Sequence, residues 1–195
     1  DNKSSFKLDD TKKLIIIYGI VAGMLYLHEK SFLHNDLKPS NILIDKDLHP
    51  KIADFGLAHK IENEDNKKND VNNNRVIGTP NYIAPEVWNV QSYSKANDVY
   101  SFGILLYELV YMKKAFSGLN PAQIVFALSK KKRPPIPDNV SSIFEPLILR
   151  CWDNAPSERP SFKEILNELN SNKYTSKNVD TKEFKKYCKF IQSYK

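Results

Sequence analysis

The sequence predicts a mainly α-helical domain with a few short strands gathered around one irregular loop. Segments 11–30 and 94–112 carry apolar residues at spacings of three and four, which is the period of a helix face. Between them, short runs at 31–33, 42–44 and 51–53 predict strands, and a polar turn between the last two is typical of a β-hairpin. With 195 residues, 41% of them hydrophobic, the chain is long enough to bury one sizeable core.

The first helix is expected over about 11–30, after a polar segment of residues 1–10 that we interpret as a linker. An N-cap is expected among residues 9–11, because Asp and Thr oxygens accept hydrogen bonds from the free N–H groups of a first turn. Gly19 and Gly23 allow a neighbouring element to pack closely on this helix. Six of its residues share one face and form the predicted buried stripe: Leu14, Ile17, Tyr18, Val21, Leu25 and His28.

The segment 94–112 is apolar on most faces, so we expect a helix at the centre of the domain, where Asp98 needs a polar partner. The loop 133–137 contains three prolines and cannot be helical. Segment 61–74 consists almost entirely of Glu, Asp, Asn and Lys, and this composition predicts a mobile surface loop. Shorter helices are expected at about 120–129, 141–152 and 161–170, with a helical turn starting near Pro85.

The stretch of eight residues from His34 to Asn41 concentrates groups that can handle a phosphoryl transfer. Asp36 can accept a hydroxyl proton, Lys38 can neutralise charge on a moving phosphate, and Asn41 can ligate magnesium. Pro39 disfavours a helical conformation for the residue before it and has no N–H group. We therefore expect a shaped loop that directs its polar side chains to one side.

This stretch resembles the catalytic loop of the eukaryotic protein kinases, which has the pattern His-Arg-Asp-Leu followed by three residues and Asn. Asn35 replaces the Arg of that pattern. Four more landmarks of the family follow in order: Asp54-Phe55-Gly56, Ala84-Pro85-Glu86, the segment Asp98 to Gly103, and Arg159. The resemblance covers roughly residues 8–170. It implies a mainly α, protein-kinase-like C-terminal lobe, a helical bundle with short β-hairpins at the catalytic loop, without the N-terminal lobe.

The resemblance also implies the site residues and the cofactors, ATP and Mg²⁺. Asp36 would accept the proton of a substrate hydroxyl, and Lys38 would contact the transferred phosphoryl group. Asn41 and Asp54 would bind the nucleotide through magnesium, since both offer the hard oxygen ligands that this ion prefers. Lys38 points to Ser/Thr specificity, because tyrosine kinases usually carry Ala or Arg around this position.

Other residues are implied to support the loop rather than to react. His34 would pack beneath it, and Asp98 would accept N–H groups from its backbone. Thr79 would hydrogen-bond near the catalytic Asp and Lys. Glu86 and Arg159 would form a buried ion pair that ties the activation segment to the lobe.

The nucleotide lid of the family has no counterpart in this sequence. Its six glycines never form Gly-x-Gly-x-x-Gly, and no upstream strand carries a phosphate-binding Lys. We therefore expect a Ser/Thr kinase lobe that transfers the γ-phosphoryl group of ATP to protein hydroxyls only when an N-terminal lobe completes it. A catalytically silent remnant that acts as an interaction module is the alternative, although the intact site residues argue against decay. The segments 78–86 and 98–103 point to the tyrosine-kinase-like group.

The activation loop lacks the usual phosphorylation switch. In many kinases the Arg before the catalytic Asp holds a phosphate on this loop. Here that position is the uncharged Asn35, and residues 57–78 contain no Ser, Thr or Tyr. We predict that activity does not depend on phosphorylation within this segment.

The net charge of +6 is unevenly distributed along the chain. Residues 171–195 carry seven Lys and two acids, whereas residues 1–170 carry 22 basic and 21 acidic groups. We therefore divide the chain into a nearly neutral kinase domain, 1–170, and a basic C-terminal tail, 171–195. A Lys-rich end of this kind is usually solvated, and no aromatic-interleaved basic patch accompanies it, so we expect no nucleic-acid partner.

The longest apolar stretch, 14–24, is interrupted by small residues, and we expect no membrane span. The polar N-terminus does not resemble a signal peptide. Cys151 and Cys188 lie far apart and fit neither a zinc site nor a disulfide framework. We therefore expect a reducing compartment and a cytoplasmic location.

Overall fold

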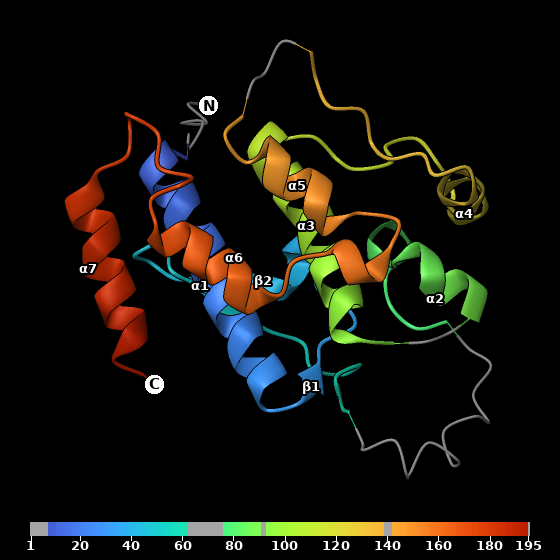
Figure 1. Ribbon diagram of the computed structural model, residues 1–195, viewed down its shortest axis with the longest axis horizontal. Helices are drawn as coiled ribbons and strands as arrows, with labels where there is room; N and C mark the ends of the chain where they lie inside the picture. Colours follow the sequence, from blue (N-terminus) through green and yellow to red (C-terminus); the bar gives the residue numbers. More distant parts are fainter. Residues whose placement is uncertain (1–7, 62–75, 91–92, 139–141, 195) are drawn as a thin grey trace, which may run out of the picture.

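The computed structural model describes residues 8–61, 76–90, 93–138 and 142–194, and within them it is a helical lobe with short strands on one side (Figure 1). The predicted mobile loop at 61–74 falls, except for its first residue, outside the described residues. The helices are α1 (Asp10–Glu29), α2 (Pro85–Val90), α3 (Lys95–Tyr111), α4 (Pro121–Ser129), α5 (Glu145–Cys151), α6 (Phe162–Asn170) and α7 (Thr181–Gln192). The strands are β1 (Phe32–Leu33), β2 (Ile42–Ile44), β3 (Pro50–Ile52) and β4 (His59–Lys60).

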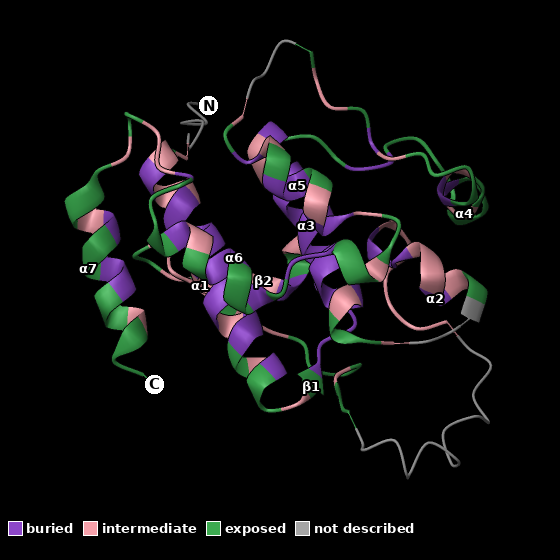
Figure 2. Cartoon of the chain, viewed as in Figure 1, coloured by how far each residue is buried: buried purple, intermediate pink, exposed green. Residues whose placement is uncertain are grey.

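Helix α3 lies at the centre of the lobe, as its apolar sequence predicts (Figures 1 and 2). Ser94 caps its N-terminus in a capping box with Asn97, so the free N–H groups of the first turn are satisfied. Helix α5 packs directly on α3, because a Cβ at Gly103 would lie 2.8 Å from Cβ of Cys151. This close contact fixes the two helices side by side.

Helix α1 is buried over more of its surface than one stripe. The six predicted stripe residues are all buried, but so are Ile15, Ile16, Ile20 and Met24. Helices α3 and α6 cover one side of α1, and β3 and α7 cover another. By length and composition α1 could cross a membrane, yet 67% of its most apolar window is buried inside this protein, as expected for a core helix.

The N-terminal cap of α1 is Asp9, whose side chain accepts a hydrogen bond of 2.8 Å from the backbone N–H of Lys12. Both glycines of α1 allow a close approach, as predicted. A Cβ at Gly19 would lie 2.5 Å from Cγ of Pro50, and one at Gly23 would lie 2.8 Å from Cδ1 of Ile52. The hairpin that carries these two neighbours therefore rests directly on the backbone of α1.

The strands form two antiparallel pairs. Strand β2 pairs with β3 in the register Ile42↔Ile52, which is the predicted hairpin with its second strand starting one residue earlier. Strand β1 pairs with β4, Leu33 lying opposite His59. The sequence did not predict β4, because a two-residue strand has too few side chains to show a period.

Two predicted elements differ from the structure. The helix expected at 141–152 is only α5, Glu145–Cys151, and Pro146 stands in its first turn, where proline is favoured. The interpretation of 171–195 as a solvated tail is wrong for much of that segment. Residues 181–192 form α7, which buries Phe184, Tyr187 and Cys188 against the lobe.

Glu168 on α6 links α5 to the segment that follows α6. Its carboxylate accepts hydrogen bonds from Arg150 at 2.8 Å, Lys173 at 2.9 Å and the hydroxyl of Tyr174. Partial burial raises the pKa of Glu168, but the hydrogen bonds from Tyr174, Lys173 and Arg150 outweigh this effect and hold the pKa at about 2. The carboxylate thus stays charged over almost the whole acid range.

We predict that Glu168→Gln lowers the free energy of unfolding by about 1–3 kcal/mol at neutral pH, because charge-assisted hydrogen bonds are lost. A folded-state pKa below the ordinary value, near 4.5, stabilises the protein above that value, and this contribution disappears as the pH falls through about 2. The difference between wild type and variant should therefore shrink on acidification. Urea unfolding at a series of pH values measures it, with the exposed Glu158→Gln as control. A difference that does not depend on pH would contradict this account.

Candidate active site

The loop between β1 and β2 is anchored by the buried carboxylate of Asp98. Its oxygens accept hydrogen bonds of 2.9 Å from the backbone N–H groups of His34 and Asn35. The Nε2 atom of His28 on α1 lies 2.9 Å from the same carboxylate. Because Asp98 is fully buried on α3, the central helix fixes the start of the loop, which confirms the predicted scaffold role.

His34 connects the loop to the strand before Asp54. It is fully buried, and its Nε2 atom lies 3.1 Å from the carbonyl oxygen of Ala53. Its ring packs on the ring of Phe55 at 5.4 Å between centroids. These contacts confirm that His34 supports the site and does not face it as a base.

Asp36 lies at the centre of a polar cluster. Nζ of Lys38 donates to its Oδ2 at 2.6 Å, the hydroxyl of Thr79 donates to its Oδ1 at 2.6 Å, and the amide of Asn41 donates to Oδ2 at 3.1 Å. Nζ of Lys38 also donates to Oγ1 of Thr79 at 2.8 Å. Residues 43 positions apart in sequence are thereby joined, and the predicted role of Thr79 is confirmed.

The Asp36 carboxylate is ionised at neutral pH. Burial raises its pKa, but hydrogen bonds from Lys38 and Thr79 and the charge of Lys38 together lower it below the ordinary value. A base must be deprotonated and must keep an accessible lone pair. Asp36 is 7% exposed, so it meets the solvent over a small area.

Asn41 and Asp54 stand at the two open ends of the β2–β3 hairpin. The Asn41 amide group donates to the backbone oxygen of Asp36 at 2.8 Å, which directs its Oδ1 away from that contact. Asp54 is exposed and accepts one weak hydrogen bond, 3.3 Å from the N–H of Gly56. The N–H of Ala53 donates to the carbonyl of Asn41 at 2.9 Å and holds the two ends together.

This donor set fits a magnesium ion that also binds nucleotide phosphates. Mg²⁺ binds one or two protein oxygens and fills its shell with water and phosphate. An amide oxygen and a solvent-facing carboxylate supply those ligands. Among the described residues no group of three or more His, Cys, Asp or Glu could hold a metal. Asp54 has a positive φ of 62°, a backbone conformation that is uncommon for a residue other than Gly.

Asn35 binds the start of the activation segment directly. Its side-chain amide donates to the carbonyl oxygen of Leu57 at 3.0 Å and lies 2.8 Å from Nδ1 of His59. The sequence indicated only that Asn35 cannot hold a phosphate. The structure shows that the uncharged Asn35 side chain contacts Leu57 and His59 directly.

The far end of the activation segment is fastened to the lobe. Arg159 makes a bidentate ion pair with Glu86 at 2.6 and 2.8 Å, as predicted. The hydroxyl of Tyr82 donates to Glu108 on α3 at 2.9 Å. Sequence reasoning missed Glu108, although an acid on a helix that is apolar on most faces was a visible signal.

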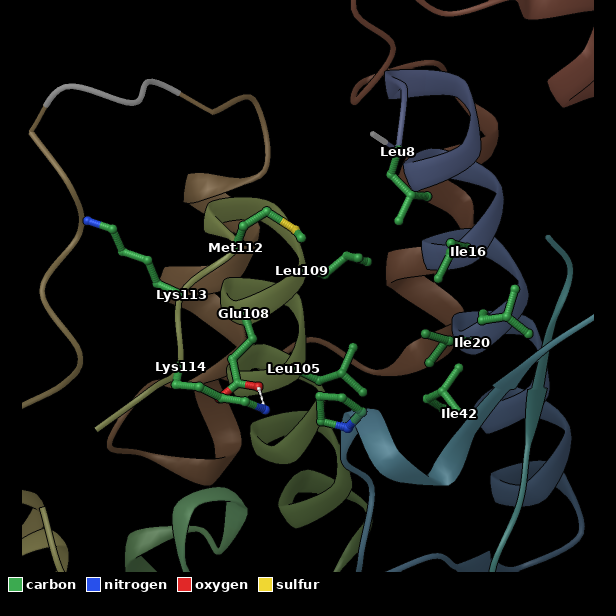
Figure 3. Close-up of a pocket in the computed structure, with 12 residues that line it drawn as sticks. Leu8, Ile16, Ile20, Ile42, Leu105, Glu108, Leu109, Met112, Lys113 and Lys114 are labelled. Atoms are coloured by element: carbon green, nitrogen blue, oxygen red, sulfur yellow. Dashed lines mark hydrogen bonds and ion pairs between the residues drawn. The ribbon is translucent and has the colours of Figure 1, made fainter. Parts of the chain in front are cut away.

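An apolar groove of about 370 Å³ opens beside the catalytic loop, between α1, β2 and the end of α3 (Figure 3). Ile16 and Ile20 line one wall and Leu105 and Leu109 the other. The ion pair of Lys114 with Glu108, at 3.1 Å, lies at its edge. Beside the groove β2 exposes large apolar side chains, since Leu43 is 57% and Ile44 is 43% exposed.

Residues 2–169 match the sequence model of the family described as protein tyrosine and serine/threonine kinase. The chain belongs to this family. The helices, the hairpin and the loop described above are therefore the helical lobe of a kinase domain, as the sequence predicted.

The kinase has many curated relatives of similar sequence. It is 38% identical over 170 residues to a probable serine/threonine-protein kinase of Dictyostelium discoideum, covering 87% of this chain and 12% of the relative. It is 37% identical to serine/threonine-protein kinase CTR1 of Arabidopsis thaliana over 84% of this chain and 20% of CTR1. It is 36% identical to serine/threonine/tyrosine-protein kinase HT1 of the same plant, over 85% of this chain and 41% of HT1.

Two of these relatives are named serine/threonine-protein kinases, and HT1 is named a serine/threonine/tyrosine-protein kinase. The chain spans between about an eighth and two fifths of their lengths. The match covers the helical lobe and the site residues Asp36, Lys38, Asn41 and Asp54.

We predict that Asp98→Asn lowers the free energy of unfolding by about 1–3 kcal/mol, because an amide offers one acceptor oxygen where the loop backbone needs two. The N–H groups of His34 and Asn35 should exchange with solvent faster than in wild type. Hydrogen exchange combined with urea unfolding measures both effects, and the exposed Asp47→Asn serves as control. Unchanged exchange at both amides would show that Asp98 does not anchor the loop.

Proposed function

We propose that this chain supplies the catalytic lobe of a protein kinase that transfers the γ-phosphoryl group of ATP to Ser or Thr hydroxyls of a protein substrate. The observation that carries this proposal is the cluster of Asp36, Lys38, Thr79 and Asn41, in which the other three side chains all donate hydrogen bonds to the Asp36 carboxylate. Such a cluster is costly to maintain without a use, because it is partly desolvated.

Asp36 would act as the base that receives the proton of the substrate hydroxyl. The lowered pKa keeps its carboxylate ionised and ready to accept a hydrogen bond from that hydroxyl. Lys38 lies against the same carboxylate and would place its positive charge beside the transferred phosphoryl group, where charge develops. Thr79 holds both side chains in one orientation.

Asn41 and Asp54 would hold magnesium and, through it, the phosphates of ATP. When bound, the ion neutralises phosphate charge and orients the γ-phosphoryl group. The protein contributes by fixing the two oxygens at the ends of one hairpin, and the hydrogen bond between Ala53 and Asn41 keeps those ends together.

The exposed apolar side chains of β2 and the adjoining groove support a larger kinase domain in which an N-terminal lobe packs on this side. Leu43 and Ile44 are partly or largely exposed although both belong to a strand next to the site. A silent interaction module is the alternative function. The hydrogen-bonded, ionised Asp36 cluster favours the catalytic function, since an interaction module does not need an ionised carboxylate with a positioned Lys and Thr.

The compartment we propose is the reducing cytoplasm. Cys151 and Cys188 are both free and buried. Burial raises the pKa of the Cys151 thiol, so the side chain behaves as a core residue and not as a redox group.

The test uses a protein that carries residues 1–195 within a complete kinase domain. Asp36→Asn should lower kcat for a peptide substrate by about 10²- to 10⁴-fold, because an amide keeps the shape but cannot accept the proton. The fold should be retained. Steady-state phosphorylation of a Ser peptide measures the rate, and Asp138→Asn on the exposed surface is the matched control. Near-normal transfer by Asp36→Asn would exclude Asp36 as the base.

The activity of the same protein should not depend on phosphorylation within residues 57–78, because Asn35 holds Leu57 and His59 without a phosphate. Phosphatase treatment tests this prediction. Tyr82 is a poor site for regulatory phosphorylation, since its buried hydroxyl is hydrogen-bonded to Glu108. Burial, and in addition the nearby Glu108 carboxylate, raise the pKa of Tyr82. Activity is measured before and after treatment, and mass spectrometry maps the remaining phosphosites. A large loss that follows a phosphate on Thr79 or Tyr82 would contradict the prediction, whereas a loss that follows a site outside residues 54–86 would not.

A further inference from the structure

Helix α7 lies beyond residues 2–169, the part of the chain that matches the kinase family. It runs beside α1 along the left edge of the lobe (Figure 1). Polar contacts fasten its start to the start of α1. The N–H of Asp180 donates to the hydroxyl of Thr11 at 2.8 Å, and Lys12 forms an ion pair with Glu183.

The buried face of α7 meets α1 through aromatic rings. Tyr18 of α1 makes edge contacts with Phe184 at 5.5 Å and with Tyr187 at 6.1 Å between ring centroids. A Cβ at Gly19 would lie 2.3 Å from the hydroxyl oxygen of Tyr187 and 2.5 Å from Cγ of Pro50. The absence of a side chain at Gly19 therefore lets α7 and the β2–β3 hairpin meet over the same turn of α1.

Helix α7 also contacts the turn of that hairpin directly. The His49 ring lies 4.6 Å from the Tyr187 ring and 5.6 Å from the Phe190 ring, with interplanar angles of 36° and 33°. The backbone of His49 is fixed within the turn, because its N–H donates to Asp45 at 2.9 Å and its carbonyl accepts from the N–H of Asp45 at 3.1 Å. A shift of the Tyr187 ring would therefore move the whole turn.

The same hairpin ends at the two proposed magnesium ligands. From the turn, strand β2 leads back to Asn41 and strand β3 leads forward to Asp54. Ile44 pairs with Pro50 near the turn, and Ala53 bonds to Asn41 at the open end. A two-stranded hairpin is marginally stable by itself, so its position depends on what covers it.

We propose that Tyr187 is a positioning residue for magnesium binding, which acts through His49 and the β2–β3 hairpin to hold Asn41 and Asp54 in register. This inference rests on the proposed function, because it takes Asn41 and Asp54 as the ligands. Helix α7, which lies beyond the family match, would then help to hold the magnesium ligands in place.

The ring of Tyr187, and not its hydroxyl, makes these contacts. The hydroxyl oxygen is buried and has no hydrogen-bond partner within the described residues. Tyr187→Phe therefore keeps every contact that the proposal needs, whereas Tyr187→Leu removes the ring that packs on His49. His49→Ala removes the same contact from the hairpin side, at a residue that is only partly buried. It also removes the contact of His49 with Phe190 and the 3.9 Å approach of its Nδ1 to the Asp45 carboxylate, so the Ala53 amide is the more specific readout for this variant.

The first measurement is hydrogen exchange on the 195-residue chain. The amides of Asp45 and Ala53 should exchange faster in Tyr187→Leu and His49→Ala, and at the wild-type rate in Tyr187→Phe. Lys185→Ala, on the exposed face of α7, is the matched control and should also behave as wild type. If Tyr187→Leu does not fold, His49→Ala decides the result.

The second measurement uses the protein with a complete kinase domain and determines the Mg²⁺ concentration for half-maximal activity at fixed ATP. It should rise by about three- to tenfold in Tyr187→Leu and His49→Ala, below the roughly 10- to 100-fold typical of losing a direct partner of a metal ligand. The kcat at saturating Mg²⁺ should change little. Partial unfolding would have the opposite signature, a lower kcat at an unchanged half-maximal concentration.

The double variant should show less than the sum of the two single rises, because both substitutions break the same contact between the Tyr187 and His49 rings. Folded variants with wild-type exchange and wild-type magnesium dependence would overturn the proposal, as would a Tyr187→Phe variant that behaves like Tyr187→Leu. If wild type shows no magnesium-dependent transfer, the proposed function fails. Faster exchange at Asp45 and Ala53 would then still show that α7 positions the hairpin, and unchanged exchange would refute that too.

Discussion

The buried carboxylate of Asp98 is the constraint on which the rest of the site depends. It accepts two backbone N–H groups of the loop and one contact from His28, so the loop is bound to the two longest helices at once. A buried charge is tolerated only where several donors surround it. Because two of its partners are N–H groups of the loop, the Asp98 carboxylate is fully hydrogen-bonded only while the loop holds its shape.

Hydrogen bonds connect this anchor to the other parts of the site. Asn35 bonds to Asp98 through its backbone and to Leu57 and His59 through its side chain, and thus links α3 to the start of the activation segment. Near the other end of that segment, the hydroxyl of Thr79 donates a hydrogen bond to Asp36. The loop, the hairpin and the two described ends of the activation segment, residues 54–61 and 76–86, are therefore linked by direct contacts.

Much of this arrangement could be predicted from the sequence, because motif residues have fixed partners. The pairs Glu86 with Arg159 and Thr79 with Asp36 are of this kind. Contacts that depend on tertiary packing could not. The spacing of Phe184, Tyr187, Cys188 and Ile191 is that of a helix face, but seven lysines between 171 and 195 suggested a solvated tail. The neutral bonds of Asn35 and the two-residue strand β4 exist only because the fold brings their partners close.

The ionisation of the Asp36 carboxyl is the property that most directly reflects this arrangement, since Lys38, Asn41 and Thr79 all donate to it. A ¹³C NMR titration of the Asp36 side chain, over the pH range in which the chain stays folded, measures its pKa. The account predicts a value below the ordinary one for Asp, near 3.8, because Lys38 and Thr79 both donate to the charged form. A value at or above the ordinary one would contradict it, because the carboxylate would then lack the partners that hold it ready to accept a proton.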